Sequence, residues 1–189
     1  MEQIRHYFEK TVKLTDSDWQ IFSSKLTKRE FPKKYLLLKA GQVENHLSFI
    51  ETGIARFYMP KEENDLTFAF AFHHNFMSGY DSFLTQTPSV YCIEALTKMS
   101  VWQLTYEGLH EIYEETEIGN AIGRQAGEEL FLKKSKRELS LLHETAEQRY
   151  LNLFTEQPEL LQQIPLKYIA SYIGITPQAL SRIRKRIYT

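Results

Sequence analysis

The chain has 189 residues, a formal net charge of −1 and 42% hydrophobic residues, which is typical of a globular protein with a sizeable core. Because Cys92 is the single cysteine, an intrachain disulfide, an iron–sulfur cluster and an all-cysteine zinc site are excluded. The start lacks a continuous apolar segment and no apolar run approaches membrane length, so we expect a cytoplasmic protein without a signal peptide or membrane contact.

Two helices are predicted at the N-terminus. The first covers residues 2–12, and the second follows a capping residue among Thr15, Asp16 and Ser17. Apolar residues recur at helical spacing in both, as Ile4, Phe8 and Val12 and then as Trp19, Phe22 and Leu26. Neither helix carries a catalytic pattern.

From Phe31 onward the apolar residues alternate, which indicates short β-strands. The segments are YLLLKAG, HLSFIETG, IARFYM, LTFAFAF, VYCIEAL and SVWQLTY. In LTFAFAF the large residues share one face, which we expect to meet the core. The small residues share the other face, which indicates either a cavity or a close neighbouring strand. Several short strands at this spacing predict a small barrel or sandwich.

Helical spacing returns near Tyr106, with a short helix over 107–113, a long one over about 117–142 and another over about 144–157. In the long helix Gly119, Gly123 and Gly127 recur every four residues. Each glycine costs a helix about 1 kcal/mol relative to alanine. The stripe therefore indicates close approach of the barrel or of a partner helix, and the alternative is an exposed face that tolerates them.

The C-terminal end is basic. From Leu160 onward there are five bases and no acid, whereas the preceding residues carry 18 bases and 24 acids. Pro165 precedes the apolar helix LKYIASYI, Gly174 ends it, and Thr176 and Pro177 begin the helix PQALSRIRKRI. This pattern predicts a helix-turn-helix, and the alternative is a helical hairpin with a solvated charged face.

The second helix of this pair has the composition of a recognition helix. Arg182 can donate two hydrogen bonds to guanine and Gln178 can pair with adenine, while later basic residues hold phosphates. The residues predicted to bind DNA are Thr176, Gln178, Ser181, Arg182, Arg184, Lys185, Arg186 and Lys167.

The order of strands, long helix and helix-turn-helix resembles the family of the cyclic-AMP receptor protein and the fumarate–nitrate reduction regulator (Crp/Fnr). The resemblance is carried by GQVENHLSFIETG, by NFMSGYDSFLTQTPSVYCIEAL and above all by IPLKYIASYIGITPQALSRIRK, where Arg182 falls on the family's base-contacting arginine. It implies an α+β fold with an N-terminal jelly-roll β-barrel like that of cyclic-nucleotide-binding domains, a long dimerisation helix and a C-terminal helix-turn-helix.

The resemblance also implies a domain order and partners. The predicted domains are a sensor barrel over 1–115, a dimerisation helix over 116–143 and a DNA-binding domain over 144–189. A homodimer would bind double-stranded DNA at a two-fold symmetric operator, with RNA polymerase as a further partner. Within the long helix, the residues assigned to the dimer interface are Gly119, Gly123 and Gly127.

The chain departs from the family at the effector site. The implied pocket comprises Gly79, Tyr80, Ser89 and Val90, and cyclic-nucleotide binders carry a glutamate and an arginine where this chain has Gly79 and Ser89. No arginine lies between Arg56 and Arg124 to pair with a buried phosphate. We therefore expect no cyclic-AMP binding of the usual kind. Because only two residues follow Ile187, we also expect no complete wing.

Two alternatives stay open. The first is a cupin-like barrel that binds a metal or a small molecule without binding DNA, for which His73 and His74 are candidate ligands if they lie in a turn. The second is a barrel that senses a small molecule and signals through a protein partner. No catalytic pattern or cofactor motif is present, so we expect no enzymatic activity, no cofactor and no metal.

Overall fold

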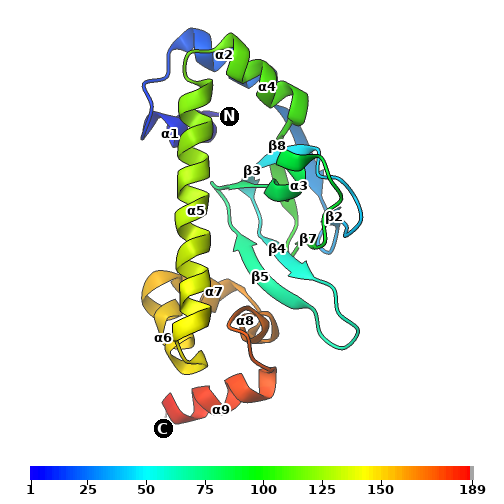
Figure 1. The fold of residues 1–189 in the computed structure, drawn as a ribbon, viewed down its shortest axis with the longest axis vertical. Coiled ribbons are helices and arrows are strands. Elements are labelled where there is room, and N and C mark those ends of the chain that lie inside the picture. Colours follow the sequence, from blue (N-terminus) through cyan, green and yellow to red (C-terminus); the bar gives the residue numbers. More distant parts are fainter. Residues whose placement is uncertain (188–189) are drawn as a thin grey trace. The chain divides into compact units, whose positions relative to one another are not determined.

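The structure, a computed structural model, describes residues 1–187 and contains two four-stranded β-sheets (Figure 1). One sheet has the strand order β1-β8-β3-β6 and the other β2-β7-β4-β5. The pairs of β8 with β1 and β3, of β3 with β6, and of β7 with β2 and β4 are antiparallel. The strands are β1 (Thr27–Phe31), β2 (Leu36–Leu38), β3 (His46–Thr52), β4 (Ala55–Met59), β5 (Leu66–Ala71), β6 (Phe76–Met77), β7 (Cys92–Ala95) and β8 (Met99–Thr105).

Helices precede, interrupt and follow the strands. The described helices are α1 (Glu2–Glu9), α2 (Asp16–Ser24), α3 (Tyr80–Thr85), α4 (Tyr106–Glu115), α5 (Gly119–His143), α6 (Ala146–Glu156), α7 (Pro158–Gln163), α8 (Leu166–Tyr172) and α9 (Pro177–Ile187). Among residues 1–187, no helix combines the length and the apolar character needed to span a bilayer.

The chain forms two compact units. The first comprises residues 1–59 and 69–127, and the second comprises residues 60–68 and 128–189. The first contains most of both sheets with α1 to α4, and the second contains α6 to α9 with the C-terminal half of α5. The division of the chain at 115 and 143 into three domains stays a prediction.

The core of the first unit is aromatic. Ile4 and Phe8 of α1 and Phe22 of α2 are buried together with Phe49 of β3. The rings of Phe8 and Phe22 lie 5.0 Å apart, in the edge-to-face arrangement that aromatic pairs prefer. The predicted cap of α2 is Thr15, whose side chain accepts from the Asp18 N–H at 3.1 Å. Both N-terminal helices are confirmed, but they are shorter than predicted, because α1 ends at Glu9 and α2 at Ser24, before Val12 and Leu26.

The strand LTFAFAF differs from its prediction. Leu66, on the face expected in the core, is 37% exposed, whereas Thr67 on the other face is 1% exposed. Thr67 donates its N–H to Ser171 Oγ at 2.8 Å, and the same hydroxyl donates to the Asp65 carbonyl at 2.8 Å. All three residues belong to the second unit. Side-chain size therefore predicted the buried face correctly at Phe70, which is 7% exposed, but not at Leu66 and Thr67, where a long-range hydrogen bond holds Thr67.

The long helix is confirmed with slightly shifted bounds. The prediction placed it at about 117–142, and α5 spans Gly119–His143. Thr116 Oγ1 accepts from the Gly119 N–H at 3.0 Å, which satisfies one backbone donor at the start of the helix. Ile122 is buried in the core of the first unit.

Candidate functional site

Helices α8 and α9 are joined by a tight turn that their sequence specifies. Gly174 has φ +81°, a conformation that favours glycine, and Ile175 donates its N–H to the Ala170 carbonyl at 3.0 Å. Thr176 Oγ1 accepts from the Ala179 N–H at 3.2 Å, and Pro177 is the first residue of α9. The capping and turn residues singled out in the sequence occupy those positions.

The two helices share a small apolar core. Ile169, Ala170 and Ile173 are fully buried, and Leu180 and Ile183 of α9 are nearly so. The buried residues of α9 lie three apart, so they share one side of the helix. The opposite side is left to polar residues.

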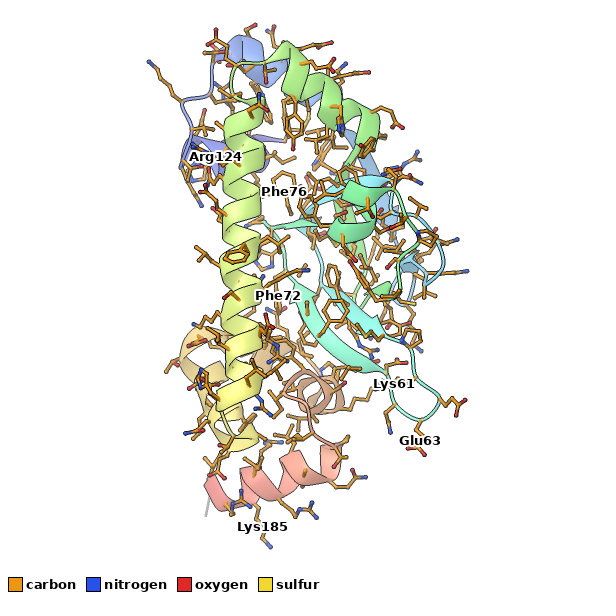
Figure 2. The ribbon with its side chains drawn as sticks, viewed as in Figure 1. Lys61, Glu63, Phe72, Phe76, Arg124 and Lys185 are labelled. Atoms are coloured by element: carbon orange, nitrogen blue, oxygen red, sulfur yellow. The ribbon has the colours of Figure 1, made fainter. Side chains whose placement is uncertain are left out.

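The outer side of α9 carries exposed polar and basic side chains and no acid. Its exposed members are Gln178, Ser181, Arg182, Lys185 and Arg186. Lys185 extends away from α9 in Figure 2. Thr176 and Lys167 are also exposed, whereas Arg184 is half-buried. We call the five residues Gln178, Ser181, Arg182, Lys185 and Arg186 the outer face.

Arg186, on the outer face, has an acidic partner in α6. Arg186 Nη2 lies 2.6 Å from Glu147 Oε2, in the first turn of α6. Both side chains are largely exposed, so the pair contributes little to stability and can exchange partners easily. Lys167 similarly lies 4.7 Å above the ring of Tyr168. No pattern in the sequence predicts the Glu147 contact, because 39 residues separate the partners.

Two arginines that lie outside α8 and α9 hold the C-terminal end of α8. Arg149 Nε donates to the Ile173 carbonyl at 2.9 Å. Arg137 donates to the Tyr172 carbonyl, and its guanidinium lies 4.0 Å from the centre of the Tyr172 ring. Cations are favourable at a helix C-terminus, where carbonyl groups lack helical partners. Sequence reasoning missed both residues, which come from α5 and α6.

The residues predicted to form an effector pocket do not all converge. Gly79 and Ser89 are buried and Tyr80 is half-buried, but Val90 is 69% exposed. The Ser89 hydroxyl donates to the Tyr91 carbonyl at 3.0 Å and accepts from the Tyr91 N–H at 3.2 Å. Ser89 is therefore engaged with its own loop.

Glu44, which sequence reasoning missed, lies in the barrel interior beside Gly79. Its Oε1 accepts from the His46 N–H at 3.0 Å and its Oε2 from the Gly79 N–H at 3.3 Å. Burial raises the pKa of Glu44, while the backbone N–H groups of His46, Gly79 and Asn45 act in the opposite direction.

A polar cavity of about 30 Å³ adjoins Glu44. It is lined by Phe31, Leu37, Glu44, His46, Ser48, Met77, Ser78, Ile93 and Gln103. Gln103 Nε2 donates to Ser48 Oγ at 3.1 Å, and burial, with Arg29 nearby, lowers the pKa of the His46 imidazole. This volume holds about two water molecules.

His73 and His74 lie in a turn after β5, which is the placement that a shared metal site would need. His74 has φ +61°, and the rings of His73 and His74 lie 4.8 Å apart. Within residues 1–187, however, no three histidine, cysteine or carboxylate side chains come together in a way that could hold a metal ion. The pair therefore has no third ligand in the described part of the chain.

Two of the three glycines of α5 meet their own chain. A Cβ at Gly119 would lie 2.6 Å from the Ile112 carbonyl oxygen, and one at Gly123 would lie 2.8 Å from the Tyr113 hydroxyl. Nothing lies within 4 Å of the corresponding point at Gly127. The close approach at Gly119 and Gly123 is thus made by α4, and the assignment of the stripe to a dimer interface stays a prediction.

Residues 28–116 match the family model described as the cyclic nucleotide-binding domain. This range contains nearly all of the strands together with α3 and α4. A comparison with curated protein sequences finds no match.

Three solved structures share the fold at low sequence identity. A structure described as a transcriptional regulator of the crp/fnr family from Eubacterium rectale has a TM-score of 0.72 and 14% identity, covering 93% of this chain and 84% of that one. The c-di-GMP responsive global regulator CLP of Xanthomonas campestris has a TM-score of 0.69 and 15% identity, covering 92% of each chain. For cAMP-bound PfPKA-R the TM-score is 0.52 and the identity 20%; the match covers 59% of this chain and 40% of that one. The fold is therefore a jelly-roll-like cyclic-nucleotide-binding fold with antiparallel sheets and a long helix.

Proposed function

We propose that this protein is a homodimeric, sequence-specific DNA-binding transcription regulator whose barrel is an effector domain that does not bind cyclic AMP in the usual way. The observation that carries the proposal is the outer face of α9, which is basic, exposed and free of acids. The likeness in fold to regulators of the Crp/Fnr family supports it.

In this proposal α8 and α9 act as a helix-turn-helix. Gln178 and Arg182, near the start of α9, contact base edges in the major groove. Lys185 and Arg186, one turn further on, contact phosphates, and Lys167 and Thr176 add contacts to the backbone. The rigid core beneath α9 and the arginines that hold α8 keep these side chains in a fixed geometry.

The C-terminal half of α5 supports the homodimer. The exposed apolar residues here are Phe131, Leu132, Leu139 and Leu142, which are between 54% and 77% exposed. Successive members of this set lie one, seven and three residues apart. They therefore gather on one side of the helix, where an apolar face of this size is favourable only when covered. We propose that the same face of a second copy covers it. Two α9 helices would then enter major grooves roughly 34 Å apart, and DNA-bound dimers would contact RNA polymerase.

Selection of bound sequences from a random DNA library tests the proposal. We expect enrichment of a two-fold symmetric site whose half-sites are separated by about one helical turn. Enrichment of no sequence, at a salt concentration low enough to retain non-specific binding, would contradict it.

A further inference from the structure

A buried acid occupies the backbone donors beside α3. The Glu44 carboxylate accepts from the N–H groups of Gly79 and His46, and the residue is 8% exposed. Backbone N–H groups that point at a carboxylate favour its charged form, and here they act against burial, which raises the pKa of Glu44. The interior of the barrel therefore contains a carboxylate whose oxygens already accept from these two N–H groups.

Glu44 is held in place by its main chain as well. Its N–H donates to Ser82 Oγ at 3.0 Å, and Ser82 Oγ in turn donates to the Thr87 carbonyl at 2.5 Å. The main chain of Glu44 is thus bonded to α3, and its carboxylate is bonded to Gly79, directly before α3.

The cavity beside Glu44 has no lysine or arginine among the nine residues that line it. The buried Arg56 pairs instead with Glu94, with 3.4 Å between Nη1 and Oε2. A second acid, Asp81, accepts a hydrogen bond from the Tyr91 hydroxyl close to Gly79. A phosphate placed here would meet like charges in a poorly solvated site.

We propose that Glu44 is a built-in anion that closes the barrel to phosphate-bearing ligands, so that any effector of this site is small and either neutral or cationic. Glu44 already satisfies the donors that an incoming anion would need, and its charge repels that anion. The cavity beside it has room for about two waters, which sets the size of a ligand in this conformation. The proposal rests on the proposed function only in taking the barrel to be an effector domain. The exclusion of anions does not depend on DNA binding.

The parent protein gives the first test, by isothermal titration calorimetry in about 150 mM salt, which screens surface charges. The probes are cyclic AMP, c-di-GMP and inorganic phosphate. We expect no saturable one-to-one binding, that is, a Kd weaker than about 1 mM for each. Stoichiometric binding of any of the three at micromolar concentration would overturn the proposal.

Substitution of Glu44 gives the second test. Glu44→Ala empties the carboxylate position and leaves two backbone donors without a partner, so a small carboxylate should take its place. In about 100 mM sodium formate we expect the Tm of this variant to rise by about 3 °C relative to sodium chloride at equal ionic strength. Absence of a formate-specific rise in a folded Glu44→Ala protein would contradict the built-in anion.

Two controls make the formate effect specific. Glu44→Gln keeps the volume filled, and Glu63→Ala removes an exposed carboxylate in the turn before β5, outside the cavity. We expect no formate-specific stabilisation of either variant or of the parent. A rise in all four proteins would show a general salt effect and would refute the proposal. If Glu44→Ala does not fold, the titrations of the parent decide alone. Loss of DNA binding would leave both readouts unchanged, so the DNA-binding part of the proposed function and the exclusion of anions fail separately.

Discussion

The barrel interior and the outer face of α9 use charge in opposite ways. Glu44 is buried, and fixed backbone N–H groups satisfy its carboxylate. Arg182 and Lys185 are exposed on a helix without acids. A buried charge is tolerated only when the protein itself satisfies it, whereas an exposed charge retains its capacity to meet a partner. In the two proposals, the barrel is therefore closed to anions and the outer face of α9 is suited to a polyanion.

The largest effect is expected from a substitution that disrupts the apolar core beneath the outer face and leaves the charged residues of that face unchanged. Leu180→Ala leaves a hole between α8 and α9 and should lower the free energy of unfolding by about 2–5 kcal/mol. Urea denaturation measures this, and fluorescence anisotropy with the selected DNA should show loss of binding. The half-exposed Leu151 of α6 provides the control, because Leu151→Ala leaves the pair intact. Parental DNA affinity in Leu180→Ala would show that the α8–α9 core is not needed.

The next effect concerns the dimer. Leu142→Glu places a charge on the exposed apolar side of α5, where burial against a second copy would leave it unpaired. We expect a monomer by light scattering after gel filtration, together with weaker binding to a two-fold site. Lys133→Glu introduces the same charge on the other side of α5 and should stay dimeric. A monomeric parent protein would remove the basis of this prediction.

Arg182→Ala tests whether a single side chain of the outer face contacts a base. It should cost about 1–3 kcal/mol of binding free energy at one base pair and relax specificity there. Anisotropy titrations against operators substituted at each position locate the effect. Lys33→Ala removes an exposed cation near the barrel and should bind like the parent. Equal affinity of the two variants for every operator would show that Arg182 does not contact a base.

Substitutions in the Arg186–Glu147 pair should change the DNA affinity by a smaller amount, and this change should not depend on the DNA sequence. Arg186→Ala should weaken binding to all DNA alike and lower the slope of log K against log salt by about 1. Glu147→Ala should strengthen binding to all DNA, because it releases Arg186 and removes a negative charge near the phosphates. Unchanged binding in both variants would place this end of α9 away from the DNA.

The smallest effect is a pH dependence on the barrel side. The Lys28 ammonium, with hydrogen bonds from Ser100 and Trp102, lowers the pKa of Glu51 from 4.5 to about 2. Glu51 therefore stabilises the fold above pH 4.5, and this stabilisation is lost as the pH falls toward 2. Because the pair is partly exposed, the difference should stay below about 1 kcal/mol. Glu51→Gln should flatten the dependence of Tm on pH between 5 and 3, and an unchanged profile would contradict this account.

The sequence predicted the elements whose signals are local. Thr15, Gly174, Thr176 and Pro177 take the positions expected from cap and turn chemistry. The long helix and most strands followed from the spacing of apolar residues. By contrast, β1 and α7 were missed. β1 reads TKREF and is exposed along most of its length, so it lacks alternation. α7 is a six-residue helix that begins at Pro158, in a segment for which the sequence predicts no helix or strand.

The features of the sites that were missed depend on contacts between distant residues. Glu44 bonds to Gly79 across 35 residues, and Arg149 to Ile173 across 24. No spacing rule within one element links such partners. The effector pocket was placed by resemblance, and the exposure of Val90 shows that an ungapped alignment does not fix which side chains face inward.

The most direct test of the central claim is the salt dependence of DNA binding by the parent protein, measured by anisotropy on a selected operator and on an unrelated duplex. The account predicts tighter binding to the operator, and for both duplexes a linear fall of log K with log salt whose slope reflects several phosphate contacts. Equal binding to the two duplexes, or an affinity that salt does not change, would contradict the assignment of the outer face of α9 to DNA.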